Sequence, residues 1–158
     1  MPLDKNKPQH RLVWMGALLF LLATVAASLA IGASAASASN APLQVDFVKH
    51  LVNPATLTFN GTTSGAVTGT LTSHVVSLNR VDGPVYNITF EWEISAGDHS
   101  FTALTDGTWN TDIGQVTLNG TVISGYLDGA QVHEQGHLID PNTLTFAGVI
   151  KLMPATTG

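Results

Sequence analysis

The chain has 158 residues, a net charge of −5 and no cysteine. Without cysteine it has no disulfides, no thiolate zinc ligands and no cysteine nucleophile. Residues 39–158 hold three basic residues against ten acidic ones, a net charge of −7, with no basic patch of the kind that neutralises phosphates. We therefore expect no nucleic-acid partner, and no attraction of this part of the chain to an anionic membrane surface.

Residues 1–38 have the composition of a secretory signal peptide. Lys5, Lys7 and Arg11 precede the apolar run LVWMGALLFLLATVAASLAIG, and residues 12–42 contain no charged side chain. The A-x-A cleavage rule fits residues 36–38 and, equally well, residues 33–35; we place the cleavage after Ala38. The run is also long enough to span a bilayer, so an uncleaved anchor is the alternative and would be the membrane contact. In both cases the domain at 39–158 is secreted or lies at the cell surface.

The sequence after the leader alternates repeatedly between apolar and polar residues, and turn residues separate the alternating stretches. The clearest stretch is VYNITFEWEIS at 85–95, in which every second residue is large and apolar. The pattern predicts eight strands and no helix, with the strands at 43–52, 55–61, 65–79, 85–95, 99–109, 114–124, 125–139 and 142–153.

Eight strands joined by short loops favour antiparallel neighbours. A single sheet with one apolar face must cover that face, and closure into a barrel does so and also removes the sheet edges. We therefore predict an all-β domain that is a single antiparallel eight-stranded barrel. A two-sheet sandwich is the alternative.

His133, Glu134 and His137 spell H-E-x-x-H, the pattern of zinc metallopeptidases. That chemistry needs a helix, on which the two histidines lie about 6 Å apart along the axis and reach one zinc, with the glutamate as general base. On a strand four residues span about 13 Å, and two histidines at that distance do not chelate one ion. Glycines surround the motif and Pro141 follows it, so we predict a strand and regard the match as coincidental. We therefore expect no cofactor; the alternative is a zinc ion held by His133 and His137.

Three further groups of side chains could carry function. Glu91 and Glu93 lie two apart on one strand, but strand neighbours on a polar face are usually solvated. His74 and His133 could meet in space if the barrel closes. Asn60, Asn87 and Asn119 each begin N-x-T and would be glycosylation acceptors in a eukaryotic secretory pathway. The aromatic residues either fill the core or line a pocket for a small apolar ligand; the candidates for the lining are Tyr86, Phe90, Trp92 and Trp109.

The stretch GYLDGA at 125–130 resembles the G-x-F-x-G-A-x-G motif of allene oxide cyclases and dirigent proteins. Leu127 replaces the aromatic residue, the next glycine is displaced to Gly136, and Gly148 resembles the glycine of the closing strand. The likeness covers roughly residues 114–152 and is based on glycines. It implies a small eight-stranded barrel whose open, apolar mouth shapes a reactive small molecule without a metal or cofactor. None of that family's catalytic residues can be matched to a position in this chain.

These patterns give three hypotheses of function. The first is a barrel that binds a small apolar molecule, with a cofactor-free cyclase or a dirigent-like guide as its more specific form. The second is a zinc metallopeptidase that uses residues 133–137. The third is a non-catalytic surface or matrix protein, which would expose an apolar patch.

Overall fold

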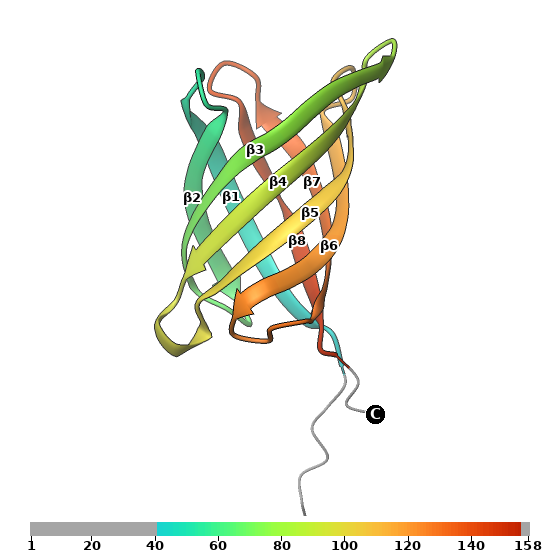
Figure 1. The fold of residues 1–158 in the computed structure, drawn as a ribbon. Coiled ribbons are helices and arrows are strands. Elements are labelled where there is room, and N and C mark those ends of the chain that lie inside the picture. The colour runs from blue at the N-terminus through green and yellow to red at the C-terminus, as the bar shows by residue number, and fades with distance from the viewer. Residues whose placement is uncertain (1–40, 156–158) are drawn as a thin grey trace, which may run out of the picture. The chain divides into compact units, whose positions relative to one another are not determined.

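The structure, a computed structural model, describes residues 41–155. These residues form a closed antiparallel barrel of eight strands in the order of the sequence (Figure 1). The predicted fold class is confirmed, and the sandwich alternative is not adopted. The strands are β1 (Leu43–Asn53), β2 (Thr58–Gly65), β3 (Gly69–Asp82), β4 (Val85–Ser95), β5 (Phe101–Asn110), β6 (Gln115–Gly125), β7 (Gln131–Asp140) and β8 (Thr145–Met153), with one short 3-10 turn, η1 (Gly97–His99), between β4 and β5.

The proposed signal peptide or anchor at residues 1–38, where the apolar run is expected to form an N-terminal hydrophobic helix, lies outside the described residues. Within residues 41–155, no helix is long and apolar enough to cross a membrane.

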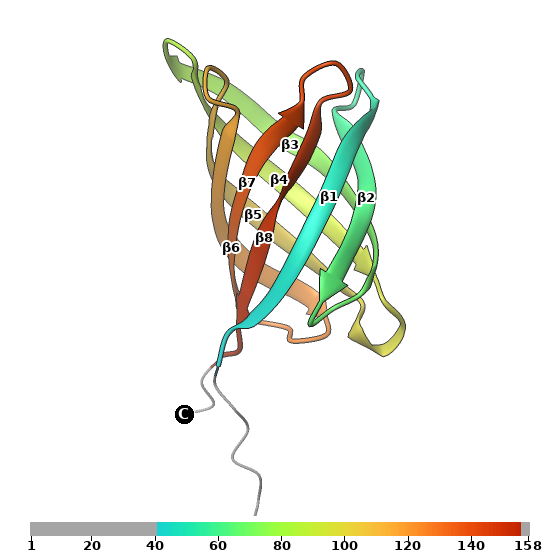
Figure 2. The ribbon, with the colours of Figure 1, turned by 180° about the vertical axis from the view of Figure 1, so that it is seen from behind.

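The barrel closes because its first and last strands pair. Leu43 of β1 lies opposite Leu152 of β8, and the register continues to Lys49 opposite Phe146. Figure 2 shows β1 between β8 and β2, with the start of β1 and the end of β8 at the same end of the barrel. This pairing satisfies the backbone groups that an open sheet would leave at its edges.

The alternation in the sequence decides which side chains enter the barrel. In β4 the residues Ile88, Phe90, Trp92 and Ile94 are buried, and the residues between them face outward. β3 contains a β-bulge at Val76, where the register steps from Val75 to Ser77. The bulge shifts the phase by one residue, so that Leu78 instead of Ser77 lies opposite the inward-facing Ile88.

Several predicted strand boundaries differ from the structure: the strand expected at 55–61 is β2 (Thr58–Gly65), and the one expected at 65–79 is β3 (Gly69–Asp82). Two further differences lie at turns later in the chain. The segment 125–139 was expected to be one strand, but residues 126–130 form the turn between β6 and β7. Leu127 and Gly129 have positive φ there, and Ala130 is fully buried. The expected strand at 142–153 begins only at Thr145, because residues 141–144 form the last hairpin loop. In both places turn geometry overrides a sequence that continues to alternate.

The two ends of the barrel differ. The end that holds the β2–β3, β4–β5 and β6–β7 loops is closed by buried side chains, among them Val67, Phe101 and Ala130. The opposite end holds the four hairpin loops β1–β2, β3–β4, β5–β6 and β7–β8 (Figure 1). We call this second end the hairpin end, and the candidate site lies there.

Candidate ligand cavity and a buried lysine–glutamate pair

A cavity of about 60 Å³ lies inside the barrel toward the hairpin end. Its wall is apolar, and its aromatic residues are Phe59, Phe90, Trp109 and Phe146. Leu57 and Leu144, from the β1–β2 and β7–β8 loops, also line it. An engineered cavity that holds benzene measures about 150 Å³, so the present cavity accepts a slender group rather than a bulky ring.

Lys49 is the charged residue in this lining. It follows Val45 and Phe47 in the inward phase of β1, and it is only 2% exposed. Its Nζ lies 4.2 Å from the ring centroids of both Phe90 and Trp92. The rings of Phe47 and Phe59 are at 5.3 and 5.8 Å. Such a position suits a cation, because the faces of aromatic rings carry negative charge density.

Glu134 of β7 is the ionic partner of Lys49. It shares the inward phase of β7 with Val132 and Gly136, and it is 1% exposed. Its Oε1 lies 3.6 Å from Lys49 Nζ across the intervening strand β8. At 3.6 Å this contact is longer than an ordinary hydrogen bond, and within residues 41–155 neither Nζ nor either carboxylate oxygen has any other hydrogen-bond partner. The pair is therefore buried with its hydrogen-bonding capacity unused.

Burial changes the proton affinity of both groups. Desolvation raises the pKa of Glu134 to about 7, and the positive charge of Lys49 only partly opposes this shift. Desolvation also lowers the pKa of Lys49, again against the attraction of Glu134. In both cases burial is the larger effect, because an apolar environment disfavours a charged form. The arrangement thus holds an amine and a carboxyl group whose proton affinities are closer than in water.

The residues predicted to line a pocket occupy three kinds of position. Phe90 and Trp109 line the cavity. Trp92 lies in the core, with its ring over Lys49 Nζ. Tyr86 packs beside Trp109, with ring centroids 6.1 Å apart, and is not part of the lining. Whether any of them binds a ligand stays a prediction.

The H-E-x-x-H segment is part of strand β7, as the sequence analysis expected, and not the helix that the peptidase alternative requires. Glu134 points into the barrel, while His133 lies on the outer face with its Nδ1 2.7 Å from Asn119 Oδ1. His137 is exposed on the same outer face. Among the residues that the structure describes, no three His, Asp or Glu side chains are grouped as metal ligands.

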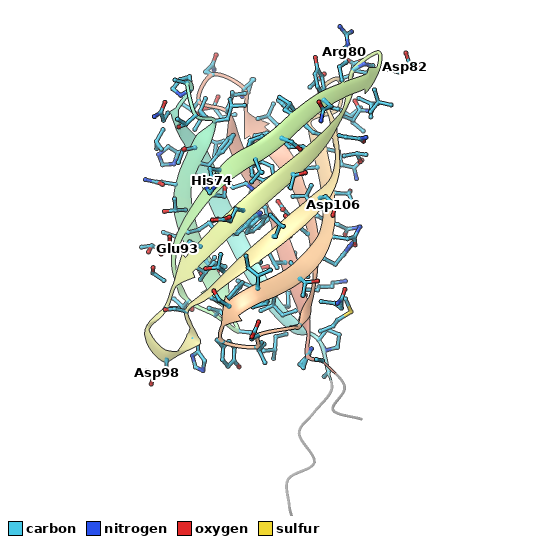
Figure 3. The ribbon with its side chains drawn as sticks, viewed as in Figure 1. His74, Arg80, Asp82, Glu93, Asp98 and Asp106 are labelled. Atoms are coloured by element: carbon cyan, nitrogen blue, oxygen red, sulfur yellow. The ribbon has the colours of Figure 1, made fainter. Side chains whose placement is uncertain are left out.

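The other predicted groups stay apart. His74 and Glu93 project from the outside of the barrel (Figure 3). His74 lies 4.0 Å from Glu91, and both side chains are well exposed. It is not near His133, because β3 and β7 are not neighbours in the barrel.

The hairpin end contains a sequence repeat that was not predicted. N-P-A-T-L-T-F at 53–59 and D-P-N-T-L-T-F at 140–146 match closely. In each, the first side chain accepts a hydrogen bond from the amide two residues later, with Asn53 bonded to Ala55 at 3.0 Å and Asp140 bonded to Asn142 at 2.9 Å. The amide of Asn142 and the hydroxyl of Thr143 lower the pKa of the Asp140 carboxyl.

Each repeat places a leucine in the left-handed region. Leu57 and Leu144 both have φ of 46°, and the corresponding position of the β5–β6 loop is Gly114, with φ of 66°. This conformation costs a residue with a Cβ about 1–2 kcal/mol. The two leucines are therefore held in a strained backbone at the positions where they line the cavity.

Lys49 was not predicted as a site residue, and Glu134 was considered only as the general base of the zinc alternative, although the sequence holds a signal that both are buried. Lys49 is in phase with Val45 and Phe47, and Glu134 is in phase with Val132. A charged residue in the apolar phase of a predicted strand is expected to be buried, and a buried charge needs a partner of opposite sign.

Comparison of the sequence with protein-family models gives no match, and no curated protein is significantly similar to it. The resemblance to allene oxide cyclases and dirigent proteins thus stays a prediction. An eight-stranded barrel by itself does not identify a function, because unrelated proteins share that fold.

Proposed function

We propose that this protein binds a small, slender apolar molecule in the cavity at the hairpin end of its barrel. The observation that carries the proposal is the apolar cavity lined by four aromatic rings, with the buried Lys49 in its wall. Binding pockets of this kind combine an apolar lining with a few polar groups that fix orientation.

A second observation supports a ligand that carries an oxygen atom. Trp109 lines the cavity, and its indole Nε1 is buried without a hydrogen-bond partner among the described residues. A buried indole N–H usually has an acceptor. A hydroxyl or carbonyl oxygen on the ligand would supply one.

The more specific form of the proposal is a cofactor-free cyclase or a guide for a reactive intermediate. Such a protein needs a water-poor pocket and a group able to exchange a proton near neutral pH. Glu134, whose pKa is raised to about 7, meets the second need.

The binding proposal is tested with a series of linear alcohols of increasing length, titrated calorimetrically into the full-length chain. Each added methylene should tighten binding by about 0.8 kcal/mol, or about fourfold, until the chain outgrows the cavity. An affinity that does not depend on chain length would contradict the proposal.

Two substitutions in β3 provide a matched pair. Leu78→Phe adds volume to a residue that lines the cavity and should weaken binding at least about tenfold, because it fills the space that the ligand needs. Val76→Phe places the same side chain at an outward position that is 54% exposed and should leave the affinity unchanged. Equal effects of the two variants would remove the cavity as the binding site.

A further inference from the structure

Lys49 has an amino group that could react with a ligand as well as contact it. An ammonium group has three N–H donors, yet its Nζ has no hydrogen-bond partner in the described part of the chain. Lys49 also lines the cavity, so a molecule that enters meets this side chain. A lysine in an apolar pocket is the usual starting point for a carbonyl-reactive amine.

We propose that Lys49 forms an imine with an apolar aldehyde or ketone that occupies the cavity, and that Glu134 transfers the protons. This inference rests on the proposed function, because the carbonyl compound must first bind in the cavity. It names the class of ligand and the residue that reacts with it.

The geometry supports the neutral pair that the reaction requires. Two buried ions without further hydrogen bonds carry a desolvation cost of several kcal/mol each. Transfer of one proton from Lys49 to Glu134, over the 3.6 Å between Nζ and Oε1, leaves an amine and a carboxylic acid, neither of which is charged. The pKa of Lys49 is lowered and that of Glu134 is raised, and both shifts favour this neutral form.

The aromatic rings suit the product as well. A protonated imine keeps a positive charge on the same nitrogen, 4.2 Å from the ring centroids of Phe90 and Trp92. Cation–π attraction therefore favours the iminium over the neutral carbonyl compound. Glu134, once ionised, is its counter-ion.

The reaction balances without an added reagent. The lone pair of Nζ attacks the carbonyl carbon and forms a C–N bond, while the C=O π electrons move to the oxygen, which takes the proton of Glu134. The nitrogen returns a proton to the Glu134 carboxylate. The same proton then leaves with the hydroxyl group as water, and the C=N bond forms. No oxidant or reductant is needed.

Reductive trapping tests the inference on the full-length chain. The protein is incubated with hexanal and cyanoborohydride at neutral pH, and labelled lysines are located by peptide mass spectrometry. The expected label is one hexanal less one oxygen atom, on Lys49. Lys151 is the internal control, because it is an exposed lysine in β8. Burial lowers the pKa of Lys49 and so leaves more of it as the reactive neutral amine, and we therefore expect Lys49 to carry most of the label.

A polar aldehyde separates pocket chemistry from general reactivity. Glycolaldehyde, which gains little from an apolar cavity, should label Lys151 in preference to Lys49. Hexanal that labels Lys151 as much as Lys49, or that leaves Lys49 unlabelled, overturns the proposal.

Two variants complete the test. Lys49→Arg keeps a positive charge beside Glu134 but forms no imine, so it should lose the label. If this variant does not fold, the position of the label in the peptide map of the protein without substitution decides. Glu134→Gln should slow labelling by about a hundredfold or more, the contribution of a positioned proton donor, while the affinity for hexan-1-ol stays within about twofold. A purely structural role for Glu134 would change both together.

Failure of this inference can be told from failure of the proposed function. If hexan-1-ol binds in the cavity but hexanal leaves Lys49 unlabelled, the cavity binds ligands and Lys49 is not reactive. Absence of both binding and labelling overturns both proposals.

Discussion

Lys49 Nζ lies 3.6 Å from Glu134 Oε1 inside the barrel, and the two side chains are 3% and 1% exposed. The pair joins β1 to β7 across β8, and Lys49 also lines the cavity. A pair buried this deeply affects both the stability of the fold and its dependence on pH.

The contribution of Glu134 to the stability should fall as the pH rises from about 4.5 to about 7, whereas Lys49, whose pKa is lowered in the folded state, contributes stability that rises with pH. The folded state raises the pKa of Glu134 from 4.5 to about 7, so it binds this proton more tightly than the unfolded chain does. The resulting stabilisation is complete below the unfolded pKa and is lost as the pH rises through the folded pKa. At about 1.4 kcal/mol per pKa unit, the loss is up to about 3 kcal/mol.

Urea denaturation at about pH 5 and about pH 8 measures this effect. Glu134→Gln should remove the decline, because glutamine does not titrate. A decline of the same size in Glu134→Gln would assign it to other groups.

Removal of one partner of the pair should cost more than removal of both. Lys49→Met leaves a buried carboxyl group alone and should destabilise the protein by about 3–5 kcal/mol near pH 8. The double variant Lys49→Met/Glu134→Leu replaces the pair with apolar side chains and should recover most of that loss. Denaturation of Lys49→Met, Glu134→Leu and the double variant completes a double-mutant cycle. A loss of stability in the double variant equal to the sum of the two single losses would mean that the residues do not interact.

The strained leucines should control access to the cavity. Truncation of both, in Leu57→Ala/Leu144→Ala, removes apolar wall from two hairpin loops. We expect the rate at which a bound alcohol dissociates to rise about tenfold, because contacts worth more than about 1.4 kcal/mol are lost. Ile113→Ala, in the third loop of the same end and 65% exposed, should leave the rate unchanged. Stopped-flow tryptophan fluorescence measures it, and equal rates in all three proteins would count against a gating role for the leucines.

Two glycines that face each other in the register should respond very differently to alanine. A Cβ at Gly148 would lie 2.1 Å from the backbone oxygen of Gln135, whereas at Gly136 the nearest atom is Phe47 Cζ at 3.1 Å. Gly148→Ala must separate β7 from β8 and should cost more than about 3 kcal/mol, whereas Gly136→Ala should cost less than about 1.5 kcal/mol. Thermal denaturation compares them, and equal midpoints would contradict the close approach at Gly148.

The sequence determined the strands of this protein and their inward faces. The alternation at 85–95 became β4 with Phe90 and Trp92 inside, because a pleated strand sends successive side chains to opposite faces. The same rule correctly expected a strand at the H-E-x-x-H segment. Eight such strands with one apolar face favoured a closed barrel. Strand ends were less well predicted, because Leu57 and Leu144 adopt a left-handed conformation that propensity does not expect of leucine.

Only the tertiary structure decided what the inward residues do together. Lys49 and Glu134 belong to strands at opposite ends of the sequence, and they meet because β1 pairs with β8 and β8 with β7. The sequence placed each of them in an apolar phase, but the distance between them depends on the stagger of the closed barrel, which no local pattern encodes. The cavity that Lys49 lines likewise combines residues of many strands with one leucine from each of two loops distant in sequence. Local patterns specify faces, whereas a site requires the distances between strands, and closure of the barrel sets those distances.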